Sequence, residues 1–112
     1  MTEWVATPGE RAIVEEILAR HLPPDTRAYV FGSRARGTTK RWADLDLSLE
    51  GDAPLSLSVL GVLRDAFDES LLPWKVDLVD RSTVSEAFGS IIDAGKVLVG
   101  DQAREGIDNA GR

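Results

Sequence analysis

The chain has 112 residues, of which 43% are hydrophobic and 29% charged, with a formal net charge of −6 and no cysteine. This length fits one small domain, the missing cysteines exclude disulfides and thiolate metal sites, and the acidic balance argues against duplex nucleic acid across the surface, because such affinity comes mainly from neutralised phosphates. We expect a cytoplasmic protein without a membrane partner, since the first ten residues do not resemble a signal peptide and no apolar run approaches the ~18 residues of a membrane span.

The N-terminal part is predicted to form a helix and then a strand. The helix begins at Thr7, where Glu10 completes the pattern of a capping box. Its apolar stripe ends near Leu22, and the two prolines that follow stop the helix. Residues 27–31 are a short strand candidate because they are rich in β-favouring side chains.

Alternating and helical patterns continue through the second half. They predict a strand at 44–50, a helix at 55–67, a strand at 74–79 and a helix at 83–95. The last helix is expected to start with a capping box of Thr83 and Glu86, to end at Gly95, and to precede a short edge strand at 97–99. The element order predicts one α/β (α+β) domain over residues 1–100, followed by a flexible tail at 101–112.

Three aspartates are predicted to meet on the sheet. Asp44 and Asp46 share one strand face, and Asp77 on the next strand can join them if the two strands, ~4.8 Å apart, pair in a suitable register. Asp80 is the competing third carboxylate, and because it lies three positions from Asp77 only one of the two can join. Carboxylates this close raise one another's pKa values unless a cation neutralises them. Oxygen ligands alone favour a hard ion such as Mg²⁺.

The turn at Gly32 and Ser33 offers donors for an anion. Glycine allows close approach of the backbone to a phosphate, and Ser33 adds a hydroxyl at the start of a short helix that could run through Arg36. Arg34 and Arg36 carry fork-shaped donors that match phosphate oxygens, although a solvated loop explains them equally well. One strand thus presents metal ligands, and the loop before it presents anion donors.

These motifs carry a resemblance to a known family. The stretch V-F-G-S-R-A-R-G at 30–37, continuing to D-L-D-L at 44–47, resembles the polymerase-β-like nucleotidyltransferase superfamily, and in particular its minimal nucleotidyltransferase (MNT) domains. Their pattern is Gly-Ser, ten residues, then Asp-x-Asp, with a third Asp on a later strand, which V-D-L-V at 76–79 resembles. Ala43 departs from the Ser found in many relatives, but this removes no metal ligand. The resemblance implies a small mixed β-sheet flanked by helices, the polymerase-β-like nucleotidyltransferase core.

The resemblance also implies a mechanism for moving a nucleotide from an NTP to an acceptor hydroxyl. The catalytic metal ligands would be Asp44, Asp46 and Asp77, holding Mg²⁺ in a two-ion site. The phosphates of the NTP would contact Gly32, Ser33, Arg36 and Arg34. Asp77 would in addition help to deprotonate the acceptor.

A partner follows from the small size of the chain. MNT domains of this size are commonly encoded beside a helical HEPN-domain toxin, and the resemblance implies an antitoxin that transfers AMP from ATP to a tyrosine near the toxin's ribonuclease site. Two alternatives stay open: an antitoxin that acts by binding alone, and a nucleotidyltransferase that modifies small molecules.

Overall fold

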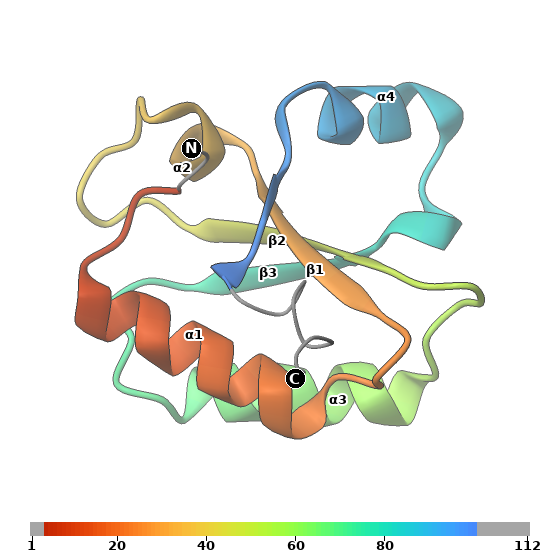
Figure 1. Cartoon of the computed structure of the whole chain (residues 1–112), viewed down its shortest axis with the longest axis horizontal. Helices are drawn as coiled ribbons and strands as arrows, with labels where there is room; N and C mark the ends of the chain where they lie inside the picture. The colour runs from red at the N-terminus through yellow and green to blue at the C-terminus, as the bar shows by residue number, and fades with distance from the viewer. Residues whose placement is uncertain (1–3, 101–112) are drawn as a thin grey trace, which may run out of the picture.

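The computed structural model describes residues 4–100 and shows one four-stranded sheet with helices on both faces (Figure 1). The helical segments are α1 (Pro8–His21), α2 (Ser33–Arg36), α3 (Leu57–Asp68), the 3₁₀ turn η1 (Arg81–Thr83) and α4 (Glu86–Gly95). The strands are β1 (Arg27–Phe31), β2 (Leu45–Glu50), β3 (Val76–Asp80) and β4 (Val97–Leu98). The predicted α/β class with a small mixed sheet is confirmed.

The sheet has the order β3-β2-β1-β4 and mixes both strand directions. β1 pairs antiparallel with β2 and with β4, whereas β2 pairs parallel with β3. A parallel pair needs a crossover connection, and α3 supplies it between β2 and β3. The parallel register sets Asp46 opposite Asp77 and Leu49 opposite Asp80.

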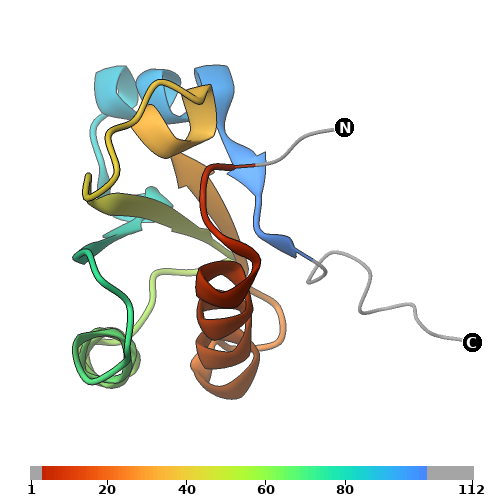
Figure 2. The same ribbon diagram turned by 90° about the vertical axis from the view of Figure 1, so that its left-hand side faces the viewer.

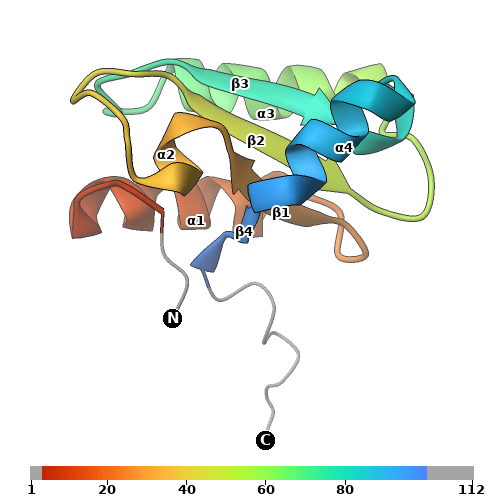
Figure 3. The same cartoon turned by 90° about the horizontal axis from the view of Figure 1, so that it is seen from above.

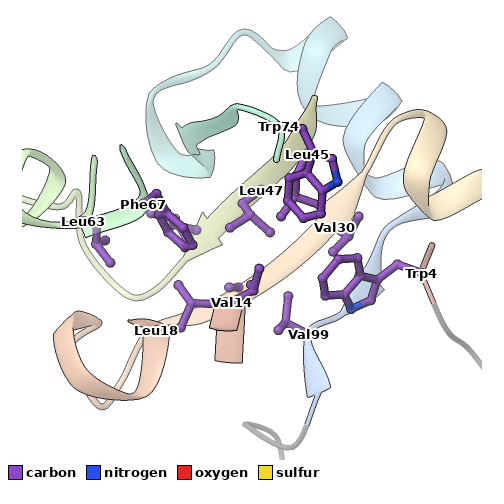
Figure 4. Packing of buried hydrophobic residues seen from close by; sticks show 12 residues of the cluster. Trp4, Val14, Leu18, Val30, Leu45, Leu47, Leu63, Phe67, Trp74 and Val99 are labelled. Atoms are coloured by element: carbon purple, nitrogen blue, oxygen red, sulfur yellow. The ribbon is translucent and has the colours of Figure 1, made fainter. Parts of the chain in front are cut away.

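The hydrophobic core lies between the sheet and the helix pair α1 and α3 (Figure 2). The alternation in β2 explains this, because Leu45, Leu47 and Leu49 are all buried on the face that these helices cover. Figure 4 shows Leu45 and Leu47 packed among side chains from α1, α3 and the segment before β3. The opposite face of β2 is therefore the polar one, and α2 and α4 lie over it (Figure 2).

Helix α4 is fastened to this polar face by ion pairs and a ring contact. Lys96 Nζ lies 2.9 Å from Glu50 Oε1 and 3.0 Å from Asp93 Oδ1. The rings of Phe31 and Phe88 meet edge to face with 5.9 Å between their centroids. These contacts hold α4 over the polar face of the sheet, against Glu50 of β2 and Phe31 of β1.

The start of α4 corrects one prediction. The capping box at Thr7 and Glu10 is present as expected, but the N-cap of α4 is Ser85, whose Oγ accepts from the Phe88 amide at 3.1 Å. Thr83 lies instead in η1, and its hydroxyl donates to the Asp80 carbonyl at 3.0 Å. The turn η1 delays the helix by two residues, because it first closes the end of β3.

Two further sequence-based expectations concern membrane-spanning segments and the C-terminal tail. Among residues 4–100, no helix combines the length and the apolar character needed to cross a membrane. The tail predicted at 101–112 lies outside the described residues.

Candidate active site

Two carboxylates meet on the polar face of the sheet. β2 and β3 run side by side (Figure 3), and their register places Asp77 directly opposite Asp46. Asp46 is half-buried and Asp77 is exposed. Burial, followed by the charges of Asp77 and Asp44, raises the pKa of Asp46 to about 6, and protonated Asp46 can donate a hydrogen bond to Asp77. The pair therefore carries an unfavourable charge that a bound cation would relieve.

Asp44 stands exposed immediately before β2, so the strand begins one residue later than the predicted 44–50. Its charge acts on Asp46, but only Asp77 shares a hydrogen bond with Asp46. Within residues 4–100, no group of three or more His, Cys, Asp or Glu side chains is gathered closely enough to hold a metal ion. An exposed aspartate changes rotamer in picoseconds to nanoseconds, so Asp44 can turn toward Asp46 and Asp77 when a cation arrives.

Asp80, the competing third carboxylate, is committed elsewhere. Its Oδ2 accepts from the Leu55 amide at 2.8 Å, and its Oδ1 accepts from the amide and the hydroxyl of Ser82 at 3.0 and 2.7 Å. Burial alone would raise the pKa of Asp80, but these hydrogen bonds lower it below the ordinary value. Asp80 thus ties the loop before α3 to the end of β3, and the geometry leaves Asp77 as the partner of Asp46.

Gly32 lies against the carboxylate of Asp46. Its backbone has φ 80° and ψ −153°, a conformation that is open essentially only to glycine. A Cβ at this position would stand 2.7 Å from Asp46 Oδ2. Ser33 follows as the first residue of the predicted short helix, α2, and its hydroxyl donates to Thr39 Oγ1 at 3.2 Å. The first residue of the Gly-Ser turn therefore lies directly against the Asp46 carboxylate.

The two arginines predicted to contact phosphate lie in different environments. Arg36 is exposed at the end of α2, where its guanidinium can reach solvent-borne anions. Arg34 is only 2% exposed, and its donors already contact the carbonyls of Val5, Arg41 and Ala43. The structure thus leaves Arg36, and not Arg34, exposed to solvent. The sequence spacing alone could not predict which of the two arginines is buried, because the burial of Arg34 depends on segments that are distant along the chain.

The residues present fit a hard divalent cation. The donors are carboxylate oxygens, which Mg²⁺ prefers, and burial together with the charges of Asp77 and Asp44 raises the pKa of Asp46. The backbone of Gly32 lies directly against this carboxylate, since a Cβ here would stand only 2.7 Å from Asp46 Oδ2. In this structure Asp46 and Asp77 offer such donors side by side, and Asp44 stands apart from them.

Metal-free protein is expected to lose stability as the pH rises from about 4 to somewhat above 6. The pKa of Asp46 is raised in the folded state to about 6, so the folded chain binds more protons than the unfolded chain in this window, and the stabilising proton is lost as pH increases. Because Asp46 is only half-buried, we expect a loss of about 1 kcal/mol after solvent screening. Thermal unfolding in EDTA at pH 5 and pH 7.5 measures this. A melting temperature that is higher at pH 7.5 would contradict the expectation.

The mixed sheet, with paired aspartates behind a Gly-Ser turn, defines a class of enzyme. The family model described as "Nucleotidyltransferase domain" matches residues 11–98, and the chain belongs to this family. It is a nucleotidyltransferase.

Individual proteins and solved structures are similar to this chain. A protein of Haemophilus influenzae (strain ATCC 51907 / DSM 11121 / KW20 / Rd), described as a probable protein adenylyltransferase MntA, is 46% identical over 96 residues, which cover 86% of this chain and 82% of the relative. A chain in a crystal structure of a toxin–antitoxin with AMP-PNP has a TM-score of 0.67 at 22% identity, over 80% of this chain and 71% of that one. A chain of the toxin–antitoxin MntA-HepT has a TM-score of 0.55 at 17% identity, over 86% and 74%. These structural likenesses show the shared fold.

Proposed function

We propose that the chain transfers AMP from ATP to a tyrosine hydroxyl of a cognate HEPN-domain toxin and thereby acts as its antitoxin. The observation that carries the proposal is the placement of Asp46 opposite Asp77 with the backbone of Gly32 against the same carboxylate. The relative that is 46% identical is described as a probable protein adenylyltransferase. The fold also recurs in toxin–antitoxin crystal structures, one of them with AMP-PNP.

The carboxylates divide the work at the site. Asp44, Asp46 and Asp77 would hold Mg²⁺, as a pair of ions, which would supply charge neutralisation and Lewis acidity for the transfer. Asp77 is the most accessible member of the opposed pair, so it faces the incoming acceptor and takes the proton of its hydroxyl. Asp46 is half-buried and lies against Gly32, so it faces the NTP rather than the acceptor.

The phosphates of the NTP lie on the other side of the site, along the Gly-Ser turn. Gly32 exposes its backbone there because it has no side chain, and the Ser33 hydroxyl is held in place by Thr39. Arg36 is exposed at the end of the same turn of helix, and its fork-shaped donors offset the charge that develops on the leaving pyrophosphate. The turn therefore binds and orients the triphosphate for in-line attack.

The test is incubation of the full chain with α-³²P-ATP and Mg²⁺, with and without a candidate HEPN-domain toxin. An Asp44→Asn, Asp46→Asn double variant serves as the catalytic control. We expect label on the toxin with the wild-type chain only, and peptide mapping should place it on tyrosine. A tight complex that stays unlabelled with every NTP would overturn the catalytic proposal and favour an antitoxin that acts by binding. Label on a sugar or drug acceptor in the absence of any protein partner would favour small-molecule transfer.

A further inference from the structure

The guanidinium of Arg34 is buried against the loop that leads to Asp44. Its Nε and Nη2 both donate to the Ala43 carbonyl, at 3.0 and 2.9 Å, and Nη2 also donates to the Arg41 carbonyl at 3.1 Å. Nη1 donates to the Val5 carbonyl at 2.7 Å. Arginine is almost never fully buried unless its donors are satisfied, and here backbone oxygens from two separate segments satisfy them. A buried cation of this kind fixes whatever backbone converges on it.

The backbone segment that accepts hydrogen bonds from Arg34 directly precedes Asp44. Residues 37–43 form neither helix nor strand, and Asp44 precedes the first residue of β2. The ladder to β3 begins one residue later, where the Leu45 amide donates to the Lys75 carbonyl at 2.9 Å. The sheet therefore fixes Asp46 but does not by itself fix Asp44. The two donors on the Ala43 carbonyl hold the peptide group immediately before Asp44 instead.

The other side of the guanidinium rests on the entry to β3. Its central carbon lies 4.2 Å from the centroid of the Trp74 ring, and Trp74 is buried beside Leu45 (Figure 4). Three residues after Trp74 comes Asp77. Burial lowers the pKa of Arg34, while the charge of Asp44 is among the effects that oppose this, so the two charges interact across the short peptide segment. Arg34 thus joins the segments that carry two of the three carboxylates.

We infer that Arg34 is a positioning residue, which sets the place of Asp44 through the carbonyl groups of the loop in front of it. This inference rests on the proposed function, which assigns Asp44 to the metal. In this role Arg34 does not touch the nucleotide; it holds the carbonyl groups of Arg41 and Ala43 in a loop outside the sheet, so that the Asp44 carboxylate needs only a rotamer change to join Asp46. Groups that orient a metal ligand in this way typically change metal affinity by about 10–100-fold when altered.

A double-mutant cycle on metal affinity tests the inference. Mn²⁺, which is visible by electron paramagnetic resonance, is titrated into the full chain and into Arg34→Lys, Asp44→Asn and the double variant. Lysine keeps the charge but lacks the planar fork that reaches several carbonyls. We expect Arg34→Lys to weaken Mn²⁺ binding by about tenfold or more, and to add less than about twofold once Asp44 is already asparagine, because the two changes act through one contact.

Arg11 provides a matched control. It too donates to backbone carbonyls of the N-terminal segment, those of Trp4 and Ala6 at 3.1 and 3.2 Å, and it lies over the Trp4 ring at 5.6 Å. Unlike Arg34, it makes no hydrogen bond to the loop before Asp44 among the contacts of the described residues. Arg11→Lys should therefore lower the melting temperature and leave Mn²⁺ affinity unchanged.

Each outcome has a distinct meaning. Wild-type Mn²⁺ affinity in Arg34→Lys, or an equally large loss in the Asp44→Asn background, would overturn the positioning role. Wild-type affinity in Asp44→Asn alone would instead overturn the metal role of Asp44 and the proposed function with it. If Arg34→Lys is partly unfolded, the titrations are repeated in trimethylamine N-oxide, which favours the compact state. A loss that persists in folded protein supports the inference, and a loss that disappears there contradicts it.

Discussion

Asp46→Asn is expected to lower the rate of nucleotide transfer by about 10³-fold while raising the stability of the metal-free protein. The rate falls because a metal ligand contributes several kcal/mol to charge stabilisation, and each ~1.4 kcal/mol is a factor of ten. The stability rises because asparagine removes the half-buried charge that faces Asp77 and Asp44. We expect a gain of about 1 kcal/mol after solvent screening, or roughly 4–8 °C in melting temperature at pH 7.5.

The pH dependence of that gain distinguishes it from a general effect of the substitution. At pH 5 most Asp46 side chains are already protonated, because the pKa is about 6, so the advantage of the variant should shrink. Asp52→Asn, in the exposed loop after β2, is the matched control and should leave both rate and melting temperature near wild type. An Asp46→Asn protein that transfers nucleotide at the wild-type rate would remove Asp46 from the catalytic site.

Gly32→Ala is expected to lower the transfer rate by about 100-fold and to destabilise the fold by about 1–3 kcal/mol. The backbone conformation of Gly32, φ 80° and ψ −153°, is essentially restricted to glycine, and forcing another residue into it costs this order of free energy. The new Cβ would also stand 2.7 Å from Asp46 Oδ2, so the carboxylate has to move. A displacement near 1 Å at a reacting centre can cost about 10²-fold in rate.

A second glycine separates this local effect from the loss of glycine as such. Gly61 lies within α3, and a Cβ built there meets no atom within 4 Å. Gly61→Ala should therefore stabilise the protein by roughly 0.5–1 kcal/mol, since alanine favours helix, and leave the rate unchanged. Thermal unfolding and single-turnover transfer measure both variants. Equal rates in the two variants would show that Gly32 does not shape the site.

The sequence by itself determined what depends on short spacing. Residues i and i+2 of a strand share a face, so the polar face that carries Asp46 and the burial of Leu45, Leu47 and Leu49 on the other face could be predicted without a structure. Asp44 was expected to share the face of Asp46, but it precedes the strand. The capping box at Thr7 is local in the same way. The Gly-Ser turn before the paired aspartates is a pattern of fixed length, and it was sufficient to recognise the family.

Only the tertiary structure decided what depends on contacts between distant segments. Asp77 and not Asp80 lies beside Asp46 because β2 and β3 pair in one parallel register, which neither strand specifies alone. Arg34 and Arg36 are two positions apart on one turn of helix, but Trp74 and the Ala43 carbonyl bury the first and leave the second exposed. Strand register and side-chain burial are set by packing across the whole domain, whereas the spacing of residues can be taken directly from the amino-acid sequence.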